Sequence, residues 1–342
     1  MKSQDKVAFI LTLPGGQNQQ SSISIKRQDF INTINKFRIS LETHRNDIVE
    51  YDTRLAKQMY DWLIKPFTTE LQQANIKTLV FVQDGILRSV PMAALYDGEK
   101  FLIQKYAIAT IPSLNLTNRN PLNRQNLRML ALGLSVEANI DGKILTILYD
   151  VPTEIDGVLD KIPGKKLLND DFTRDRLNQE LDKQAYPIIH IATHGEFGTQ
   201  PEDTFIVTGK KDPATGNNET LSFNELEKQI RKITRSNQLL ELLTLTACET
   251  AVGDERSALG LAGVAVQAGA KSALASLWAI QDNSTAQIAI SFYNKLLNNP
   301  NMSKAEALQS AQIEMIEGKT ASQGQLAHPA YWSPLILIGN WL

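Results

Sequence analysis

Cysteine is nearly absent from this sequence: Cys248 is the only one among 342 residues. A single cysteine cannot form an intramolecular disulfide, and zinc sites that need several cysteines are excluded. A reducing compartment is therefore expected. No glycine-rich phosphate loop of the G-x-G-x-x-G or G-x-x-x-x-G-K-[ST] kind is present either, so we expect no cofactor and no metal.

Long apolar runs are also missing. The apolar segment Val7–Leu13 covers only seven residues before Pro14, which is short for the core of a signal peptide. No later stretch reaches the roughly eighteen apolar residues of a membrane-spanning helix. We therefore expect a soluble, cytosolic protein without membrane association.

An excess of charge of either sign is absent too. The 35 basic and 37 acidic residues leave a formal net charge of −2. Nothing in this balance favours nucleic acid or an anionic membrane as a partner. What the sequence does contain is ordinary for a globular protein, because 42% of its residues are hydrophobic and can form a sizeable core.

Short apolar segments bounded by turn residues predict strands, and most of them alternate with segments of helical periodicity. The predicted strands are Val7–Leu13, which we expect to be buried, its hairpin partner Ser22–Lys26, and then Thr78–Val82, Lys105–Ile111, Leu127–Leu134, Ile188–Thr193, Leu239–Ala247, Lys271–Trp278 and Leu335–Ile338. The predicted helices lie within Gln28–Ala74 and at Ser257–Ala268, Ser284–Leu297 and Ser303–Glu317.

This alternation predicts an α/β fold with a mostly parallel central sheet covered on both faces. The Asn-rich stretch Asn115–Asn126 is the best candidate for an internal boundary, which gives an N-terminal lobe of residues 1–125 and a second lobe of residues 126–342. The segments Glu137–Asp150 and Phe197–Thr220 are predicted as loops, and any gating or self-cleavage is expected there.

Two strand ends carry the residues with the most chemistry. IIHIATHG places His194 just beyond one strand, and LLTLTAC places Cys248 at the end of another, 54 positions later. Groups at the carboxyl ends of neighbouring strands, which are roughly 4.8 Å apart, can come within hydrogen-bond reach. A neutral imidazole could then take the thiol proton and leave a thiolate that attacks a carbonyl.

Gly195 follows the histidine directly. A residue without a Cβ lets a substrate pass close and leaves its N–H exposed. Together with the N–H of Cys248 it would form a two-donor oxyanion hole, and each such donor contributes about 10²–10³ in rate in studied enzymes.

Other readings of the same residues stay open. On general grounds a lone cysteine at a strand end is more often an inert core residue. His190 lies within the strand and is interpreted as a packed structural residue, while His44 is expected in solvent and His328 is left open. Asp282 is either a helix N-cap or a charged wall of a specificity pocket.

Several motifs resemble the CHAT domain, a caspase- and separase-related peptidase module. DGILRSVPMAAL, within the segment from Leu79 to Ser113, is similar to the opening signature of that family. IIHIATHGEF resembles its histidine motif, LLTLTACETAVG its cysteine motif, and GLAGVAVQAGAKSALASLWAIQDNSTA the segment that follows. HPAYWSPLILIGNW is similar to its closing strand, so the resemblance covers about residues 76–342.

The resemblance implies a caspase-like three-layer fold and a cysteine endopeptidase with His194 and Cys248 as its dyad. It also implies that Gly195 and Cys248 supply the oxyanion amides. Asp282 resembles an acidic residue that faces the residue before the scissile bond, which implies cleavage after a basic residue. Glu249, next to Cys248 in the sequence, is either a second acidic candidate for substrate binding or only a loop or helix-start residue. The sensor domain that usually accompanies the family is not visible, so we expect an excised fragment or a stand-alone member, and an activating or inhibitory protein partner.

Two other functions compete with a cysteine endopeptidase. The chain could be a catalytically silent CHAT-like interaction module, although such a module has no need of both the His-Gly and the Ala-Cys pairs. A glutamine amidotransferase would want an elbow of the G-x-C-x-G kind, and the segment around Cys248 reads Thr-Ala-Cys-Glu-Thr instead.

Overall fold

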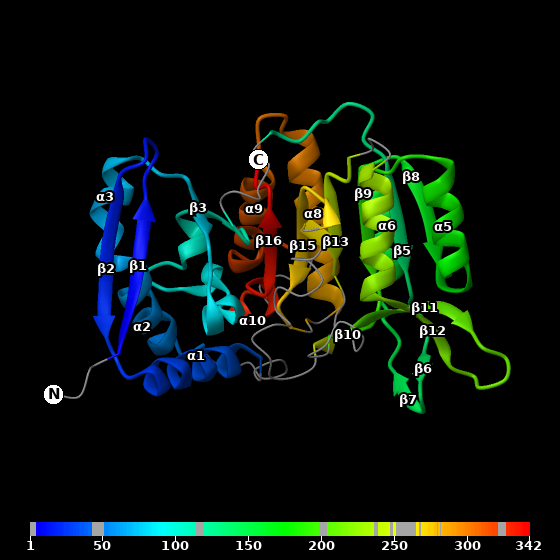
Figure 1. Cartoon of the computed structure of the whole chain (residues 1–342), viewed down its shortest axis with the longest axis horizontal. Helices are drawn as coiled ribbons and strands as arrows, with labels where there is room; N and C mark the ends of the chain where they lie inside the picture. The colour runs from blue at the N-terminus through cyan, green and yellow to red at the C-terminus, as the bar shows by residue number, and fades with distance from the viewer. Residues whose placement is uncertain are drawn as a thin grey trace.

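The fold is taken from a computed structural model that describes residues 5–42, 51–113, 120–197, 204–235, 239–246, 249–250, 265–266, 268–278, 280, 282–320 and 326–342. Its centre is one eight-stranded sheet with the strand order β3-β4-β16-β15-β13-β9-β5-β8 (Figure 1). The strands are β3 (Thr78–Phe81), β4 (Ala107–Thr110), β16 (Leu335–Gly339), β15 (Ser272–Ser276), β13 (Leu242–Leu245), β9 (Ile188–Ala192), β5 (Met129–Gly133) and β8 (Gly164–Leu168).

All neighbouring strands in this sheet run parallel except β15 and β16, which pair antiparallel. The carboxyl ends of β5, β9, β13 and β15 therefore lie at one edge, and β16 begins at that same edge. Each of these parallel strands is connected to the next by a long crossover, as parallel pairing requires. The predicted α/β fold with a mostly parallel sheet is confirmed.

Side chains of the sheet alternate between two separate cores, because successive residues of a strand point to opposite faces. In β9, Ile188 and Ala192 belong to the larger core, and Ile189 and Ile191 belong to the smaller one. Both faces are thus apolar, which explains why these strands read as continuous hydrophobic runs.

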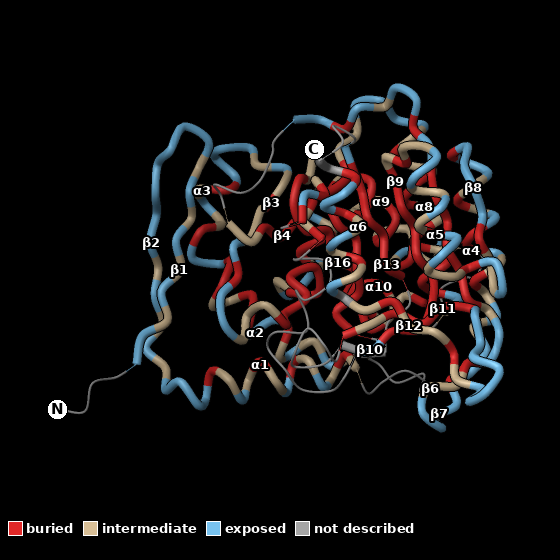
Figure 2. The backbone as a smooth tube through the Cα atoms, turned by 45° about the vertical axis from the view of Figure 1, so that its right-hand side comes forward, coloured by how far each residue is buried: buried red, intermediate tan, exposed pale blue. Residues whose placement is uncertain are grey.

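Helices cover the two faces and complete three layers. The larger core is closed by α2 (Arg54–Leu63), α4 (Val151–Leu159), α8 (Asp282–Asn298), α9 (Lys304–Ile316) and α10 (Pro329–Trp332). The smaller core is closed by α5 (Arg174–Lys183) and α6 (Phe223–Arg235). The buried residues form a continuous band through the sheet (Figure 2).

The helix ends follow their sequence signals where these are strong. Ser303 and Glu306 form the predicted capping box at the start of α9, with Ser303 Oγ accepting from the Glu306 N–H. α2 ends at Leu63, and Pro66 lies in the 3₁₀ turn that follows it (Lys65–Phe67). The chain becomes α-helical again in α3 (Thr68–Gln73). The predicted helix Ser257–Ala268 lies mostly outside the described residues.

The expectation that Val7–Leu13 is a buried strand is wrong. The strand forms as β1 (Lys6–Thr12) and pairs antiparallel with β2 (Asn18–Ser24), but none of its residues is fully buried and Ile10 is 70% exposed. Only Val7, Phe9 and Leu11 pack against the larger core, because this two-stranded sheet has one covered face (Figure 2). Next to it, α1 (Arg27–Glu42) buries four residues on one side.

The segments predicted as loops contribute strands to two smaller sheets. Residues within Glu137–Asp150 form a hairpin of β6 (Ala138–Ile140) and β7 (Lys143–Leu145). A second sheet has the order β12-β11-β10-β14, with β10 (Gly195–Phe197), β11 (Phe205–Lys211), β12 (Asn218–Ser222) and β14 (Glu249–Thr250). The strands β6, β7 and β10 have three residues each, too few for an alternating pattern to stand out. β11 has seven residues, but its buried residues are consecutive and do not alternate with exposed ones.

Strands from both halves of the sequence share the central sheet, since β3 and β4 precede residue 125 and the other six follow it. The division into lobes 1–125 and 126–342 stays a prediction. None of the helices in the described part of the chain combines the length and apolar character needed to cross a bilayer.

One glycine in β11 is expected to be essential for packing. A Cβ added at Gly209 would lie 1.8 Å from the Asn169 carbonyl oxygen, which is backbone and cannot rotate away. Gly209→Ala should therefore lower the free energy of unfolding by about 1–3 kcal/mol, measured by urea denaturation. Lys211→Ala, an exposed change on the same strand, is the control, and equal stability of the two variants would contradict the expectation.

Candidate active site

The two strands that precede the predicted dyad are direct neighbours. β9 and β13 pair in parallel with Ile191 opposite Leu245. Thr246, the last described residue before the cysteine, donates its N–H to the Ile191 carbonyl at 3.1 Å. His194 therefore lies at the same sheet edge as the segment that leads into Cys248. Cys248 itself lies outside the described residues.

His194 is held by a main-chain carbonyl. Its Nε2 lies 2.7 Å from the Thr146 carbonyl oxygen, and only 7% of the residue is exposed. A carbonyl can only accept, so Nε2 must carry the proton. In the neutral ring, Nδ1 is then the basic nitrogen. Thr146 was missed by the sequence analysis because every residue type has a carbonyl, so no sequence signal marks the one that is used.

The turn around His194 is fixed by strand β11. The Val207 N–H donates to the His194 carbonyl at 2.8 Å, and the Thr193 hydroxyl donates to the Val207 carbonyl at 2.7 Å. Val207 is fully buried in a small apolar cluster with Leu134, Ala138 and Leu145. Leu145 immediately precedes Thr146, so the same cluster orients both the histidine and the carbonyl that it contacts.

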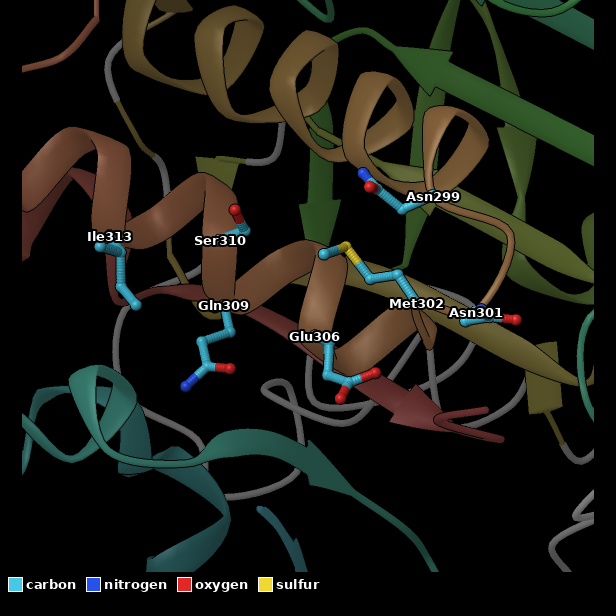
Figure 3. Close-up of a pocket in the computed structure, with 7 residues that line it drawn as sticks. All are labelled: Asn299, Asn301, Met302, Glu306, Gln309, Ser310 and Ile313. Atoms are coloured by element: carbon cyan, nitrogen blue, oxygen red, sulfur yellow. The ribbon is translucent and has the colours of Figure 1, made fainter.

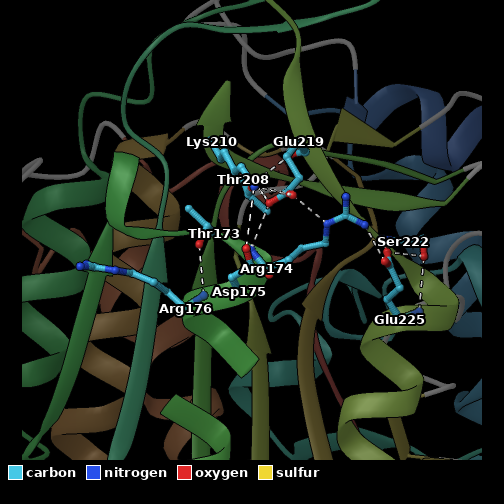
Figure 4. Close-up of polar contacts among 9 residues, drawn as sticks. All are labelled: Thr173, Arg174, Asp175, Arg176, Thr208, Lys210, Glu219, Ser222 and Glu225. Atoms are coloured by element: carbon cyan, nitrogen blue, oxygen red, sulfur yellow. Dashed lines mark hydrogen bonds and ion pairs between the residues drawn. The ribbon is translucent and has the colours of Figure 1, made fainter. Parts of the chain in front are cut away.

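β11 is in turn anchored by an ion-pair network (Figure 4). Arg174, at the start of α5, bridges Glu219 of β12 at 3.1 Å and Glu225 of α6 at 2.6 Å. Thr208 of β11 donates to the Glu219 carbonyl. Burial would raise the pKa of Glu219, but hydrogen bonds from the Arg174 backbone and guanidinium outweigh it and keep the pKa below its usual value. The network stays ionised near neutral pH and ties the β11–β12 hairpin to two helices.

Gly195 lies in β10, opposite Ile206 of β11. A Cβ at this position would lie 3.0 Å from the Phe205 carbonyl oxygen and 3.3 Å from the Ile206 side chain. The close approach of β11 is thus one physical reason for a glycine here. The oxyanion role of Gly195 stays a prediction.

Glu249 begins β14, whose backbone pairs parallel with β10, Glu196 being opposite Glu249. The residues on either side of the undescribed pair 247–248 therefore lie beside the chain that carries His194. The predicted roles of Glu249 and Cys248 stay predictions.

Asp282 is the first residue of α8, two residues earlier than the predicted helix start. Its Oδ2 accepts a hydrogen bond of 2.6 Å from the Asp150 N–H, at the start of α4. Burial raises the pKa of Asp282 to about 6; the Asp150 hydrogen bond opposes this shift, and the charges of Asp150 and Glu154 reinforce it. Asp282 therefore lies inside the first turn of α8 rather than at its N-cap, and its specificity role stays a prediction.

His190 is a buried structural residue, as interpreted from the sequence. Its Nε2 lies 2.9 Å from the Glu154 carboxylate of α4, and both residues are at most 1% exposed. The imidazole also packs against the Tyr293 ring, with the centroids 5.8 Å apart. Glu154, which the sequence analysis did not single out, is the partner that makes this burial tolerable.

His328 is the remaining histidine in the described part of the chain, and it precedes β16, which begins at this same sheet edge. His328 caps α10 by accepting from the Ala330 N–H, and His44 lies outside the described residues. An open groove of about 530 Å³ runs past Asn299, Met302, Gln309 and Ile313 (Figure 3). It adjoins the last residue of α8, whereas Asp282 is the first, so a helix of 17 residues, roughly 25 Å long, separates them. Among the described residues, no group of three His, Cys, Asp or Glu side chains could hold a metal ion.

The Glu154–His190 pair should contribute strongly to stability. Glu154→Ala would leave a buried imidazole without its carboxylate, and breaking such a pair costs about 3 kcal/mol or more in unfolding free energy. Chemical denaturation measures the loss. Glu227→Ala, which breaks the surface pair with Arg231 on α6, should change stability by less than about 1 kcal/mol. A loss for Glu154→Ala as small as this control's would count against the buried pair.

Comparison with known proteins places the chain in a family. The CHAT domain family matches residues 53–340. The three-layer arrangement described above agrees with the caspase-like fold expected from that family. No protein of curated function matches the sequence significantly.

Solved structures with a similar arrangement include gingipain R (RGPB), an Arg-specific cysteine proteinase, at 10% identity and a TM-score of 0.48, covering 92% of this chain and 74% of that one. The separase of Saccharomyces cerevisiae, in complex with securin, has 14% identity and a TM-score of 0.46, covering 96% of this chain. This chain covers only 21% of that separase chain. A complex of the Porphyromonas gingivalis RgpB pro- and mature domains has 10% identity and a TM-score of 0.47, covering 92% of this chain and 76% of that one. By the family match over most of its length, the chain belongs to the CHAT domain family.

Proposed function

We propose that the protein is a cysteine endopeptidase with Cys248 as nucleophile and His194 as general base. The observation that carries the proposal is the contact of His194 Nε2 with the Thr146 carbonyl at 2.7 Å. This contact makes Nδ1 the proton acceptor. The parallel pairing of β9 and β13 supports Cys248 as the donor of that proton.

The reaction follows from these roles. His194 Nδ1 takes the thiol proton, and the thiolate forms a bond to the peptide carbonyl carbon. The carbonyl electron pair moves to oxygen, where the N–H groups of Gly195 and Cys248 would stabilise the negative charge. The imidazolium then gives its proton to the leaving nitrogen as the C–N bond breaks. Water, deprotonated by His194, then adds to the thioester carbonyl. The C–S bond breaks, the second product leaves as a carboxylic acid, and the proton on His194 returns to the Cys248 sulfur.

The Thr146 carbonyl has a further use during the reaction. When Nδ1 gains the proton, the ring becomes an imidazolium whose Nε2–H still points at that carbonyl dipole. The contact therefore strengthens as charge develops, and this favours the thiolate–imidazolium state over the neutral pair.

A basic residue before the scissile bond is the preferred substrate feature that we propose. Asp282, Asp150 and Glu154 cluster at the neighbouring ends of α4 and α8, and His190 pairs with Glu154 alone. The excess of carboxylates favours a cation nearby. Asp282 is our candidate for contacting that cation, with Glu249 as the second acidic candidate.

The substrate would be a protein or peptide. Ile144, Ile147 and Tyr149 flank the segment that contacts His194 and are 55%, 41% and 78% exposed. Apolar side chains so exposed beside a reactive site suit contacts with a peptide chain. An activating or inhibitory protein partner remains part of the proposal, and a silent interaction module is the alternative that the first experiment distinguishes.

The dyad is tested by thiol chemistry as well as by cleavage. In a peptide library, Cys248→Ala should abolish cleavage, and His194→Ala should lower the rate by about 10²–10⁴. A thiol-directed peptide inactivator should label the wild type, and His194→Ala should suppress labelling because the thiolate is lost. His44→Ala serves as the matched control. Labelling that is equally slow in the wild type, His194→Ala and His44→Ala would refute a catalytic dyad and favour the silent module.

The acidic specificity predicts a pH dependence. The pKa of Asp282 is about 6, so the carboxyl is mostly protonated at pH 5 and mostly ionised at pH 7. The preference for arginine over its neutral analogue citrulline, taken as a ratio of kcat/KM values, should rise about tenfold or more over this range. The ratio cancels the titration of the dyad itself. In Asp282→Asn the ratio should stay flat, and a rise as steep as in the wild type would remove Asp282 from the specificity pocket.

A further inference from the structure

The segment Thr146–Asp150 has few anchors. Thr146, Ile147 and Tyr149 are exposed, and only Leu148 packs partly against the larger core. Asp150 is the N-cap of α4, where its carbonyl accepts from the Glu154 N–H at 2.8 Å. To elements other than β7 and α4, which it connects, this segment makes two hydrogen bonds in the part of the chain that the structure describes. One joins the Thr146 carbonyl to His194 Nε2 at 2.7 Å, and the other joins the Asp150 N–H to Asp282 Oδ2 at 2.6 Å.

The two bonds hold opposite ends of one short connection. Thr146 follows the buried Leu145 of β7, and Asp150 precedes the buried Val151 of α4. Ile147 and Tyr149 between them are exposed and Leu148 is half-buried, so besides these two bonds and the start of α4 at Asp150 little restricts the backbone torsions that aim the Thr146 carbonyl. Asp282 comes from α8, a helix with eight buried residues, five of which belong to the larger core. A rigid helix therefore holds one end of a thinly anchored segment.

We propose that Asp282 is a positioning residue for His194. Its carboxylate fixes the Asp150 end of the segment and thereby keeps the Thr146 carbonyl against Nε2, which holds the imidazole in the tautomer that deprotonates Cys248. The inference rests on the proposed function for its catalytic meaning, but the geometry it describes exists whether or not the chain is active.

This role differs from binding a basic substrate residue, because it needs a hydrogen-bond acceptor and does not need a charge. Asp282→Asn keeps an acceptor oxygen at the same distance and removes the charge. Asp282→Ala removes both. Asp282→Ser keeps a side chain suited to a helix start, so α8 should stay intact. The serine oxygen is one bond too short to reach the Asp150 N–H, so this variant removes the contact between Asp282 and Asp150 alone.

The first measurement needs no substrate. Long-range ¹H–¹⁵N correlation spectra of histidine-labelled protein report the tautomer of each neutral imidazole, and the chain has only four histidines. The His194 signals are assigned from their loss in His194→Ala. We expect the Nε2–H tautomer in the wild type and in Asp282→Asn. In Asp282→Ala and Asp282→Ser the two nitrogen signals should move toward each other, as both tautomers become populated.

Asp156→Ala is the matched control, because it removes an exposed carboxylate of α4 that pairs with Lys166 and does not touch the segment. Thermal unfolding of every variant identifies any that has lost its fold. A folded Asp282→Ala or Asp282→Ser with wild-type His194 signals would overturn the proposal. Equal disturbance in Asp282→Asn would overturn it as well, because the charge rather than the acceptor would then be responsible.

Kinetics give the second measurement in an active preparation. On a peptide with a neutral residue before the scissile bond, Asp282→Ala should lower kcat about tenfold with little change in KM, since a misaligned base affects the transition state alone. Asp156→Ala, the exposed control on α4, should keep the wild-type kcat on that peptide. An unchanged kcat in Asp282→Ala would contradict positioning. Absence of cleavage in the wild type would count against the proposed function only, because the spectra test the positioning independently.

Discussion

The parallel pairing of β9 with β13 is the constraint on which the candidate site depends. It aligns two apolar strands so that the residues following them emerge at one edge of the sheet. Within the sheet both faces are buried, so polar side chains there must be paired, as His190 is with Glu154. Beyond the last strand residue the chain leaves this apolar environment, and His194 can meet a polar partner.

The histidine illustrates how a fold supplies chemistry through its backbone. Its tautomer is fixed by the Thr146 carbonyl, its main chain by Val207, and both depend on the small apolar cluster around Val207 and Leu145. The ion pairs of Arg174 hold the hairpin that contains Val207. The orientation of one imidazole thus depends on β7, β11, β12, α5 and α6, which are distant in sequence. A rigid scaffold holds this orientation at little entropic cost during the reaction.

Among the acidic groups beside this edge, Asp282 can take two roles. Asp282 is tied to α4 through the Asp150 N–H, and burial, reinforced by the charges of Asp150 and Glu154, raises its pKa to about 6. A carboxyl in such a place can act as an anchor through its oxygen lone pairs and as a recognition element through its charge. The two roles use different properties of the same group, so they are compatible and separable.

The sequence by itself determined the α/β class, most strands of the central sheet and the CHAT family, because long apolar runs and linear motifs are local features. It also placed His194 at a strand end and His190 inside the strand. It misjudged the burial of β1, because the exposure of a strand depends on what covers it. It missed the β6–β7 hairpin, because strands of three residues leave too short a pattern. Only the tertiary structure selected Thr146, Val207, Glu154 and the Asp150–Asp282 contact. Main-chain carbonyls and amides are the same in every residue, so folding alone decides which of them meet.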